Sequence, residues 1–268
     1  MDSEVLQVEK RGAVDWVTMN RPDTLNALNG ELIEALAGYF EERYRDHETR
    51  IIVLTGAGRG FCSGADLGGG ALIGKADDAG RVQVAMRTQR RIGDIYRAMR
   101  RCPQPIISLV NGAAAGGGFA LVLASDIRIA RPRAKMNAAF IRIGLTACDM
   151  GTSYFLPRLV GSAVASELLL TGRFIEAEEA HALGLVNRVV EESDFEETAQ
   201  GFIDQMLTTA PMGLRMTKEA LDHAIDAQSL DAAMAMEDRQ QIVMLQTADH
   251  AEAISAFLER RKPKFEDR

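Results

Sequence analysis

The sequence feature that most constrains the fold is a strand-like segment that leads into three consecutive glycines. Residues 106–110 are mostly β-branched or aliphatic, which predicts a buried strand, and the pattern breaks at residues 111–112, Asn-Gly. An apolar helix is then expected to begin at residues 116–118, which are all glycine and leave main-chain N–H groups uncovered. Because the first N–H groups of a helix have no internal partner and lie at the positive end of its dipole, they can bind a negatively charged oxygen. The alternative is that the glycines only permit tight packing.

A second segment repeats this arrangement. Residues 51–54 predict another buried strand, and a glycine-rich turn follows it. The turn ends in Gly64, Ala65 and Asp66, where further backbone amides can be exposed. Two turns of this kind, each after a buried strand, can direct one N–H group each at the same oxygen.

These two turns read SGADL at residues 63–67 and NGAAAGGG at residues 111–118, and the pair resembles the enoyl-CoA hydratase/isomerase (crotonase) superfamily. Three further segments extend the resemblance over nearly the whole chain: NRPDTLNALN at 20–29, LPRLVG at 156–161 and FLERRKPKF at 257–265. The resemblance implies an α/β fold, built as a crotonase-like spiral of ββα units with a C-terminal helical region. It also implies that the two turns form the oxyanion hole for an acyl-CoA thioester.

Hydrophobic periodicity predicts the remaining elements. Strands are expected at 5–10, 14–20, 126–129 and 185–190, the first two forming a hairpin around Arg11-Gly12. Helices are expected from Asn29, before Pro103 and, after residue 151, at 152–159, 162–170, 176–183, 195–207, 214–227, 230–246 and 248–260. The glycine-rich segment 68–80 predicts a mobile loop. We divide the chain into a ββα core over residues 1–200 and a helical region over residues 201–268.

Two predictions concern which helix faces are buried. The helix that begins after Asn29 is expected to bury Leu32, Leu36, Phe40 and Tyr44. The methionines of the C-terminal region are expected to face the core rather than a neighbouring subunit: Met234, Met236 and Met244. In the family that the chain resembles, this region builds trimers, often paired into hexamers. The resemblance therefore implies a homotrimer or a dimer of trimers.

Composition and charge exclude several classes of function. The chain has 268 residues and a formal net charge of −7, without a basic stripe, which argues against nucleic-acid binding. Its three cysteines have neither disulfide nor metal-site spacing, and the N-terminus lacks the apolar core of a signal peptide. No apolar run reaches the length of a membrane span. We therefore expect a cytoplasmic protein without a metal, a disulfide framework, a membrane contact or a nucleic-acid partner.

The resemblance assigns binding roles to particular residues. The N–H groups of Ala65 and Gly117 are expected to donate to the thioester oxygen, where they stabilise the enolate that forms during reaction. Lys264 and Phe265 lie in the family's C-terminal tail, which can contact the coenzyme, and a solvated tail is the alternative. Coenzyme A is expected only as part of the substrate, with no separate cofactor. The adenine and pantetheine of coenzyme A are expected against the first turn, at Ala65, Asp66, Leu67 and Gly68.

The carboxylates are where the chain departs from the family pattern. The hydratases carry two glutamates, and the matching positions here are Ala120 and Phe140. Asp149 is the carboxylate that remains in a comparable place, and in relatives that resemble this segment an aspartate takes part in the chemistry. Apolar neighbours such as Phe140 and Cys148 are expected to raise its proton affinity, which suits general acid/base work. The alternative is that Asp149 only caps the following helix by bonding the amides near Thr152.

Structural roles are expected for the other polar candidates. Asp66 is expected to fix its turn, and Arg142 to form an ordinary salt bridge rather than meet an anionic ligand. Cys62 and Cys148 are expected to be small buried hydrophobes. The histidines are expected at the surface, on helices away from the motifs, so that a Ser-His-Asp arrangement has little support: His47, His181, His223 and His250.

These observations together predict an acyl-CoA thioester enzyme of the enoyl-CoA hydratase/isomerase type, with Asp149 as its acid/base. One alternative is a different reaction on the same kind of substrate, such as double-bond isomerisation, thioester hydrolysis or a change of a carbon–carbon bond. The other alternative is a protein that binds acyl-CoA and catalyses nothing. The replacement of both glutamates favours this second alternative.

Overall fold

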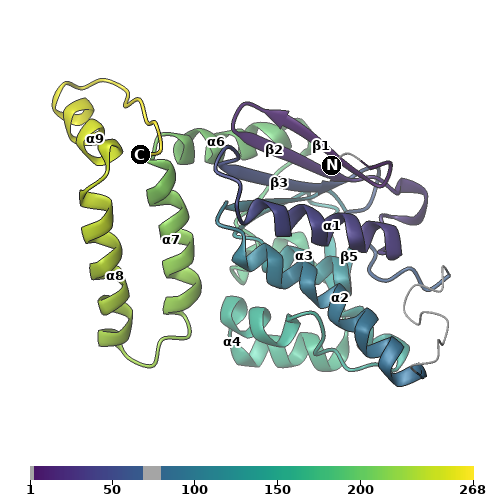
Figure 1. Cartoon of the computed structure of the whole chain (residues 1–268). Coiled ribbons are helices and arrows are strands. Elements are labelled where there is room, and N and C mark those ends of the chain that lie inside the picture. The colour runs from purple at the N-terminus through teal and green to yellow at the C-terminus, as the bar shows by residue number, and fades with distance from the viewer. Residues whose placement is uncertain (1–2, 69–79) are drawn as a thin grey trace.

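The computed structural model describes residues 3–68 and 80–268, and its centre is a six-stranded sheet (Figure 1). The strands follow the order β1-β2-β3-β4-β6-β9, and every neighbouring pair is parallel except the β1–β2 hairpin. Their bounds are Leu6–Arg11 (β1), Val14–Met19 (β2), Ile51–Gly56 (β3), Ile106–Val110 (β4), Ile127–Ala130 (β6) and Arg188–Val189 (β9). The α/β class is confirmed.

The structure differs from the predicted strands and loops in three details. Arg11 pairs with Val14 as the last pair of the hairpin, so the turn is Gly12-Ala13 rather than Arg11-Gly12. The strand expected at 126–129 begins one residue later, and the strand expected at 185–190 shortens to β9. The loop predicted over 68–80 lies, apart from its two end residues, outside the described residues.

Side chains of the central strands alternate between two apolar layers. In β3, Ile52 and Leu54 belong to the larger core, while Ile51 and Val53 belong to a smaller core on the other face. The larger core is built with α1 (Gly30–Arg43), α2 (Arg81–Arg101) and α3 (Gly117–Ala124), and the smaller one with α6 (Phe195–Leu207). Because helices cover both faces, β3 and β4 are apolar on both sides apart from Thr55 and Ser108.

Helix α1 begins as expected and ends earlier than its apolar pattern indicated. The Asn29 side chain accepts a hydrogen bond from the N–H of Leu32 at 2.9 Å, which caps the helix. Leu36 and Phe40 are buried with Leu32. Tyr44 is 62% exposed, because the helix ends at Arg43, so the prediction that Tyr44 is buried was wrong.

A small three-stranded sheet was not predicted from the sequence. It consists of β5 (Ala114–Ala115), β7 (Lys135–Asn137) and β8 (Ile175–Glu176), in the order β5-β7-β8. Strands of two or three residues carry no hydrophobic period that could reveal them. Short 3₁₀ helices also occur, at Pro22–Thr24 (η1), Ala139–Ile143 (η2) and Glu192–Asp194 (η3). The small sheet matters for function because β5 leads from β4 to the glycines that begin α3.

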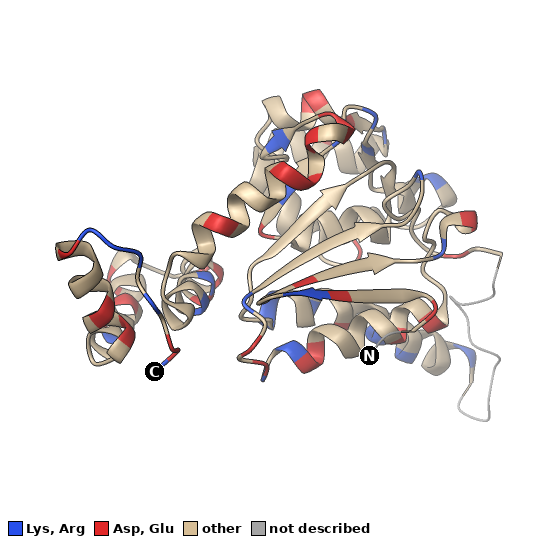
Figure 2. Cartoon of the chain, turned by 90° about the horizontal axis from the view of Figure 1, so that it is seen from above, with Lys and Arg blue, Asp and Glu red and all other residues tan. Residues whose placement is uncertain are grey.

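Helices dominate the chain after residue 151. Their bounds are Thr152–Thr171 (α4), Ala177–Ala182 (α5), Pro211–Ala224 (α7), Leu230–Leu245 (α8) and Ala248–Leu258 (α9). Helix α4 joins two predicted helices, and Gly161, with φ +77° and ψ 162°, forms the kink between them. Helices α7 and α8 lie side by side, and with α9 they project beyond the sheet (Figures 1 and 2).

For the C-terminal helices, one prediction about burial was wrong, and the prediction of a domain boundary is not tested. None of the described residues of α8 is buried, so the expectation that Met234, Met236 and Met244 face the core was wrong. The boundary drawn at residue 200 stays a prediction. Helix α6, which spans this boundary, packs on the sheet through Phe195 and Ile203.

A cluster of charged side chains joins α7 to the sheet. The Lys218 side chain is 5% exposed, and its ammonium group donates to the carbonyl of Gln104 at 2.8 Å and pairs with Asp126 at 2.9 Å. Arg100, in the last turn of α2, pairs with Asp126 at 2.8 Å and also with Asp222 of α7. Burial acts to raise the pKa of Asp126, but the two cations hold that pKa below its usual range. The cluster therefore fixes where the C-terminal helices leave the sheet.

Candidate active site

The two glycine-rich turns that follow β3 and β4 are hydrogen-bonded to each other. The N–H groups of Phe61 and Cys62 donate to the carbonyl of Ala113 at 3.0 and 3.2 Å, and the N–H of Ala115 donates to the carbonyl of Cys62 at 2.9 Å. A Cβ atom added to Gly118 would lie 2.0 Å from the Cys62 carbonyl oxygen, so a larger residue does not fit there. Gly117 is restricted as well, because a Cβ atom there would lie 2.7 Å from Cδ1 of Leu28, so tight packing accounts for two glycines of the run.

The N–H group of Ala65 points away from the segment that precedes α1. Leu28 forms a parallel bridge with Ala65, in which the Leu28 N–H donates to Gly64 at 2.7 Å and the Leu28 carbonyl accepts from Asp66 at 3.0 Å. The residue between two such bonded neighbours directs its own N–H and C=O to the opposite side. Across the described residues, the structure shows no acceptor for the Ala65 N–H.

Gly117 is the first residue of α3, and it follows Gly116, whose φ of +52° favours glycine. The Gly116 N–H donates to the carbonyl of Asn137 at 2.9 Å, and the Ala120 N–H donates to the carbonyl of Gly116 at 3.0 Å. Within residues 3–68 and 80–268, no acceptor bonds the Gly117 N–H. A Cβ atom added to Gly64 would lie 3.5 Å from the Gly117 nitrogen, so the two turns come together beside these amides.

The groups next to this turn are largely apolar. A Cβ atom added to Gly117 would lie 3.1 Å from the sulfur of Met150. The Phe140 ring packs against Gly116, 3.3 Å from where a Cβ atom would stand. Ala120, in the first turn of α3, is fully buried. Positions 120 and 140 therefore place apolar side chains beside the glycines.

Tyr96 of α2 connects this turn to the loop that carries Asp149. Its buried hydroxyl group donates to the carbonyl of Gly117 at 3.0 Å and lies 3.1 Å from the sulfur of Met150. Burial raises the pKa of the Tyr96 phenol well above its usual value, which keeps the group neutral. Since Met150 directly follows Asp149, the aspartate is one residue away from a side chain that contacts Gly117.

The carboxyl group of Asp149 is held by two hydrogen bonds. The N–H of Met150 donates to it at 2.7 Å, and the side-chain amide of Gln89 donates to it at 2.6 Å. Burial raises the pKa of Asp149, and the two hydrogen bonds offset part of this increase. The Thr152 N–H donates to the main-chain carbonyl of Asp149 at 2.9 Å, and helix α4 begins after Gly151 without a side-chain cap, so the alternative that the Asp149 carboxylate caps this helix was wrong.

The first turn also carries the other residues expected to bind substrate. The Asp66 carboxylate pairs with Arg21 at 3.0 Å, which confirms that it helps to fix the turn. Leu67 is 64% exposed, Gly68 is exposed, and Ala65 is partly exposed. A ligand can therefore reach this turn from solvent, and the role of these residues in binding stays a prediction.

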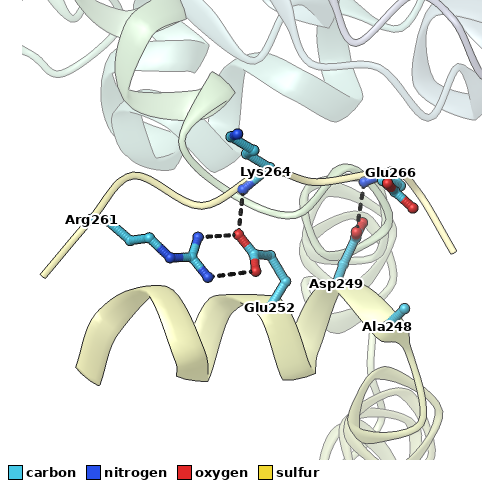
Figure 3. A pocket seen from close by; sticks show the side chains of 6 residues that line it. All are labelled: Ala248, Asp249, Glu252, Arg261, Lys264 and Glu266. Atoms are coloured by element: carbon cyan, nitrogen blue, oxygen red, sulfur yellow. Dashed lines mark hydrogen bonds and ion pairs between the residues drawn. The ribbon is translucent and has the colours of Figure 1, made fainter. Parts of the chain in front are cut away.

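Lys264 and Phe265 lie in the C-terminal tail, which folds back along α9 (Figure 3). The Glu252 carboxylate binds the guanidinium group of Arg261 through two hydrogen bonds and accepts the N–H of Lys264 at 2.7 Å. A surface cavity of about 490 Å³ lies between the tail and the helix. This tail is far from α3 within the same chain (Figure 1), and its predicted contact with the coenzyme stays a prediction.

Some of the remaining polar candidates lie elsewhere than expected. Cys62 is buried, which raises the pKa of its thiol to about 12, but Cys148 is exposed, so the expectation for Cys148 was wrong. Arg142 is exposed and forms no ion pair with the described residues. His47 lies in a bend rather than a helix, and it is exposed. The histidines on helices are exposed or partly exposed: His181, His223 and His250.

The described residues contain no group of three or more histidine, cysteine, aspartate or glutamate side chains that could hold a metal ion. Their helices include none with the length and apolar character needed to cross a membrane.

Two functional candidates, Gln89 and Tyr96, were missed in the sequence. They are seven positions apart in α2, which places them two turns apart on the same face. This helix was predicted only from the periodicity of its apolar residues before Pro103. The available signal was a pair of hydrogen-bonding side chains at this spacing on a helix that otherwise buries apolar residues.

Known proteins with similar sequences match nearly the whole chain. The enoyl-CoA hydratase/isomerase family profile matches residues 9–268. A probable enoyl-CoA hydratase of Mycobacterium tuberculosis is 39% identical over 266 residues, which cover 99% of this chain and 93% of that protein. The 1,2-epoxyphenylacetyl-CoA isomerase of Escherichia coli is 38% identical over 267 residues, which cover 99% of this chain and 98% of that protein.

Solved structures show the same relationship. The crystal structure of a probable enoyl-CoA hydratase/isomerase from Mycobacterium abscessus matches with a TM-score of 0.90 at 35% identity. The match covers 98% of this chain and 99% of that one. This chain therefore has the crotonase fold and belongs to the enoyl-CoA hydratase/isomerase family.

Proposed function

We propose that this protein is an acyl-CoA enzyme that moves a proton between two carbon atoms of its substrate, as a double-bond isomerase does. The N–H groups of Ala65 and Gly117 hold the thioester oxygen, and Asp149 transfers the proton. The observation that carries the proposal is the convergence of two turns, each with an amide that has no acceptor in the described chain, next to a loop with a partly buried carboxyl group.

The reaction follows from these groups. In a 3-enoyl thioester, the Asp149 carboxylate removes a proton from the carbon next to the carbonyl, and the electron pair moves onto the thioester oxygen. The two amides stabilise this negative charge, and one such donor is typically worth about 3–4 kcal/mol of the barrier. The protonated Asp149 then returns the proton to the far carbon of the former double bond, which gives the 2-enoyl isomer and restores the carboxylate.

The apolar residues at two positions favour isomerisation over hydration. In the family pattern, hydratases hold a water molecule between two glutamates, and the matching residues here are Ala120 and Phe140. Both are buried beside the glycines, where neither can orient water. A single carboxylate is sufficient for a proton that leaves one carbon and returns to another. One of the relatives described above is also named as an isomerase.

The proposal includes how the substrate is bound. Coenzyme A enters as part of the substrate, and no separate cofactor takes part. Its adenine and pantetheine lie along the accessible first turn, which provides Ala65, Asp66, Leu67 and Gly68. The cytoplasmic location expected from the cysteine spacing is retained as part of the proposal.

We further propose that the chain assembles as a homotrimer or a pair of trimers through α7, α8 and α9. Large apolar side chains are exposed along these helices and the turn between them, and a monomer seldom leaves so much apolar surface in water: Leu221, Ile225, Leu230, Met234, Ile242, Val243, Leu245, Ile254, Phe257 and Leu258. In such an assembly, the tail with Lys264 and Phe265 contacts the coenzyme of a neighbouring chain. Light scattering is expected to give three or six times the chain mass of 29.2 kDa, and a monomer at micromolar concentration would refute the assembly.

The reaction is tested with a panel of 2-enoyl, 3-enoyl and dienoyl thioesters of coenzyme A. We expect double-bond migration to be about a hundred-fold faster than addition of water, because Ala120 and Phe140 replace the two glutamates that hold water in the hydratases. Chromatography of the products and the incorporation of deuterium from D₂O measure both reactions. Equal rates would show that water is activated by another route. Binding of thioesters without turnover would favour the non-catalytic alternative.

A further inference from the structure

The two hydrogen bonds of Asp149 both end on the same carboxyl oxygen. The N–H of Met150 donates to Oδ1 at 2.7 Å, and Nε2 of Gln89 donates to Oδ1 at 2.6 Å. We propose that Oδ2 is the oxygen that carries the proton during reaction, and that Gln89 is the positioning residue that holds Oδ1. This inference rests on the proposed function, because it assigns that function's proton to one atom.

The unequal use of the two oxygens supports this assignment. Because a carboxyl oxygen has two lone pairs, the two hydrogen bonds that Oδ1 accepts leave it little capacity for a third hydrogen bond. Within the described part of the chain, Oδ2 has no hydrogen-bond or ion-pair partner. A proton can therefore add to Oδ2, and Oδ1 then remains the carbonyl oxygen of a neutral carboxylic acid, which still accepts both hydrogen bonds. The carboxyl group can thus gain and lose its proton without any change in its contacts.

Helix α2 places Gln89 and Tyr96 for related tasks. Gln89 bonds the carboxyl group, and Tyr96, two turns further along the same face, bonds the carbonyl of Gly117. Seven residues of α-helix span about 10.5 Å, so a rigid element sets the separation between the base and the glycine turn. A base that is held in this way keeps the geometry that proton transfer requires.

The charged groups around Asp149 do not provide another explanation for its orientation. From α2, Tyr96 faces this region, and its phenol is neutral because burial raises its pKa. On the same loop, Cys148 is exposed. Among the described residues, neither Arg90 of α2 nor Arg142 of η2 is ion-paired with Asp149. The neutral amide of Gln89 is therefore the side chain that orients the carboxyl group.

The variant Gln89→Leu tests the inference. We expect kcat/KM to fall about ten-fold with little change in KM, since a hydrogen bond to a charged group is lost. Because that bond favours the ionised carboxylate, its loss raises the pKa of Asp149, so the acid limb of the pH–rate profile moves to higher pH. Gln89→Glu puts a second carboxylate beside Asp149, and we expect the acid limb to move in the same direction. Gln89 is exposed, so neither change disturbs the core.

The matched control is Gln200→Leu. Gln200 makes the same kind of bond on α6, from Nε2 to Asp204 at 2.6 Å, and its removal is expected to leave the pH–rate profile unchanged. Infrared difference spectra between each protein and its Asp149→Asn form report the titration of the Asp149 carboxyl directly, whether or not the enzyme turns over. An unchanged titration midpoint and an unchanged acid limb in Gln89→Leu would overturn the inference. If Asp149→Asn stays fully active, the proposed function and the catalytic assignment to Oδ2 both fail, while a raised infrared midpoint would still support the Gln89 contact.

Discussion

The Asp149→Asn variant is expected to lose about 10³-fold in kcat on every thioester that the wild-type protein isomerises. The amide has nearly the shape of the carboxyl group, but it cannot accept and return a proton, and such a group typically contributes 10²–10⁴-fold. Wild-type activity is expected to fall as the pH decreases through the raised pKa of Asp149, because the base must be ionised. Steady-state assays of both proteins over a pH series provide the measurement.

The control for this variant is Asp204→Asn. Asp204 also accepts a hydrogen bond from a glutamine side chain, but it is exposed on helix α6, away from the glycine turns. Its substitution is expected to leave kcat unchanged, and urea midpoints of both variants are expected to match that of the wild-type protein. Equal activity of Asp149→Asn and the wild-type protein on all converted substrates would remove Asp149 from the mechanism.

The sheet and the glycine turns could be predicted because their signals are local. Strands β3 and β4 are short apolar runs between turns, and glycines follow each run. Because a glycine has no side chain, it indicates either tight packing or an uncovered amide that can bind an anion. The sequence also correctly indicated that a helix begins at Asn29, whose side chain caps α1 in the structure. These features depend on residues a few positions apart, which single-sequence patterns can describe.

The organisation of the site could not be predicted because it depends on contacts between distant segments. Leu28 sets the direction of the Ala65 amide, and nothing in either segment indicates their pairing. Gln89 and Asp149 are 60 residues apart, so their bond follows only from the packing of α2 against the loop before α4. The prediction for the methionines of α8 was wrong for a related reason. Methionine is common in protein cores, but the position of α8 in the fold leaves these side chains outside the core.

The same kind of distant contact determines the last prediction, which concerns stability. Lys218→Met is expected to lower the free energy of unfolding by about 3 kcal/mol, because the largely buried carboxylate of Asp126 then loses one of its two cationic partners. The value is at the lower end of the range for broken buried pairs, since Arg100 still bonds Asp126. Urea unfolding followed by circular dichroism measures it. A double variant that also carries Asp126→Asn is expected to recover part of the loss, as the unpaired charge is removed.

The pH dependence provides a second measure of the same pair. Because the folded-state pKa of Asp126 lies below the 3.8 of a free aspartate, its contribution to stability is present above that pH and is lost as the pH falls through the folded-state value. The difference between Lys218→Met and the wild-type protein is therefore expected to shrink in acid. Lys262→Met, on the exposed tail, provides the matched control, with an expected change within about 0.5 kcal/mol. If Lys218→Met also stays within that limit at neutral pH, α7 is held to the sheet by apolar packing rather than by this pair.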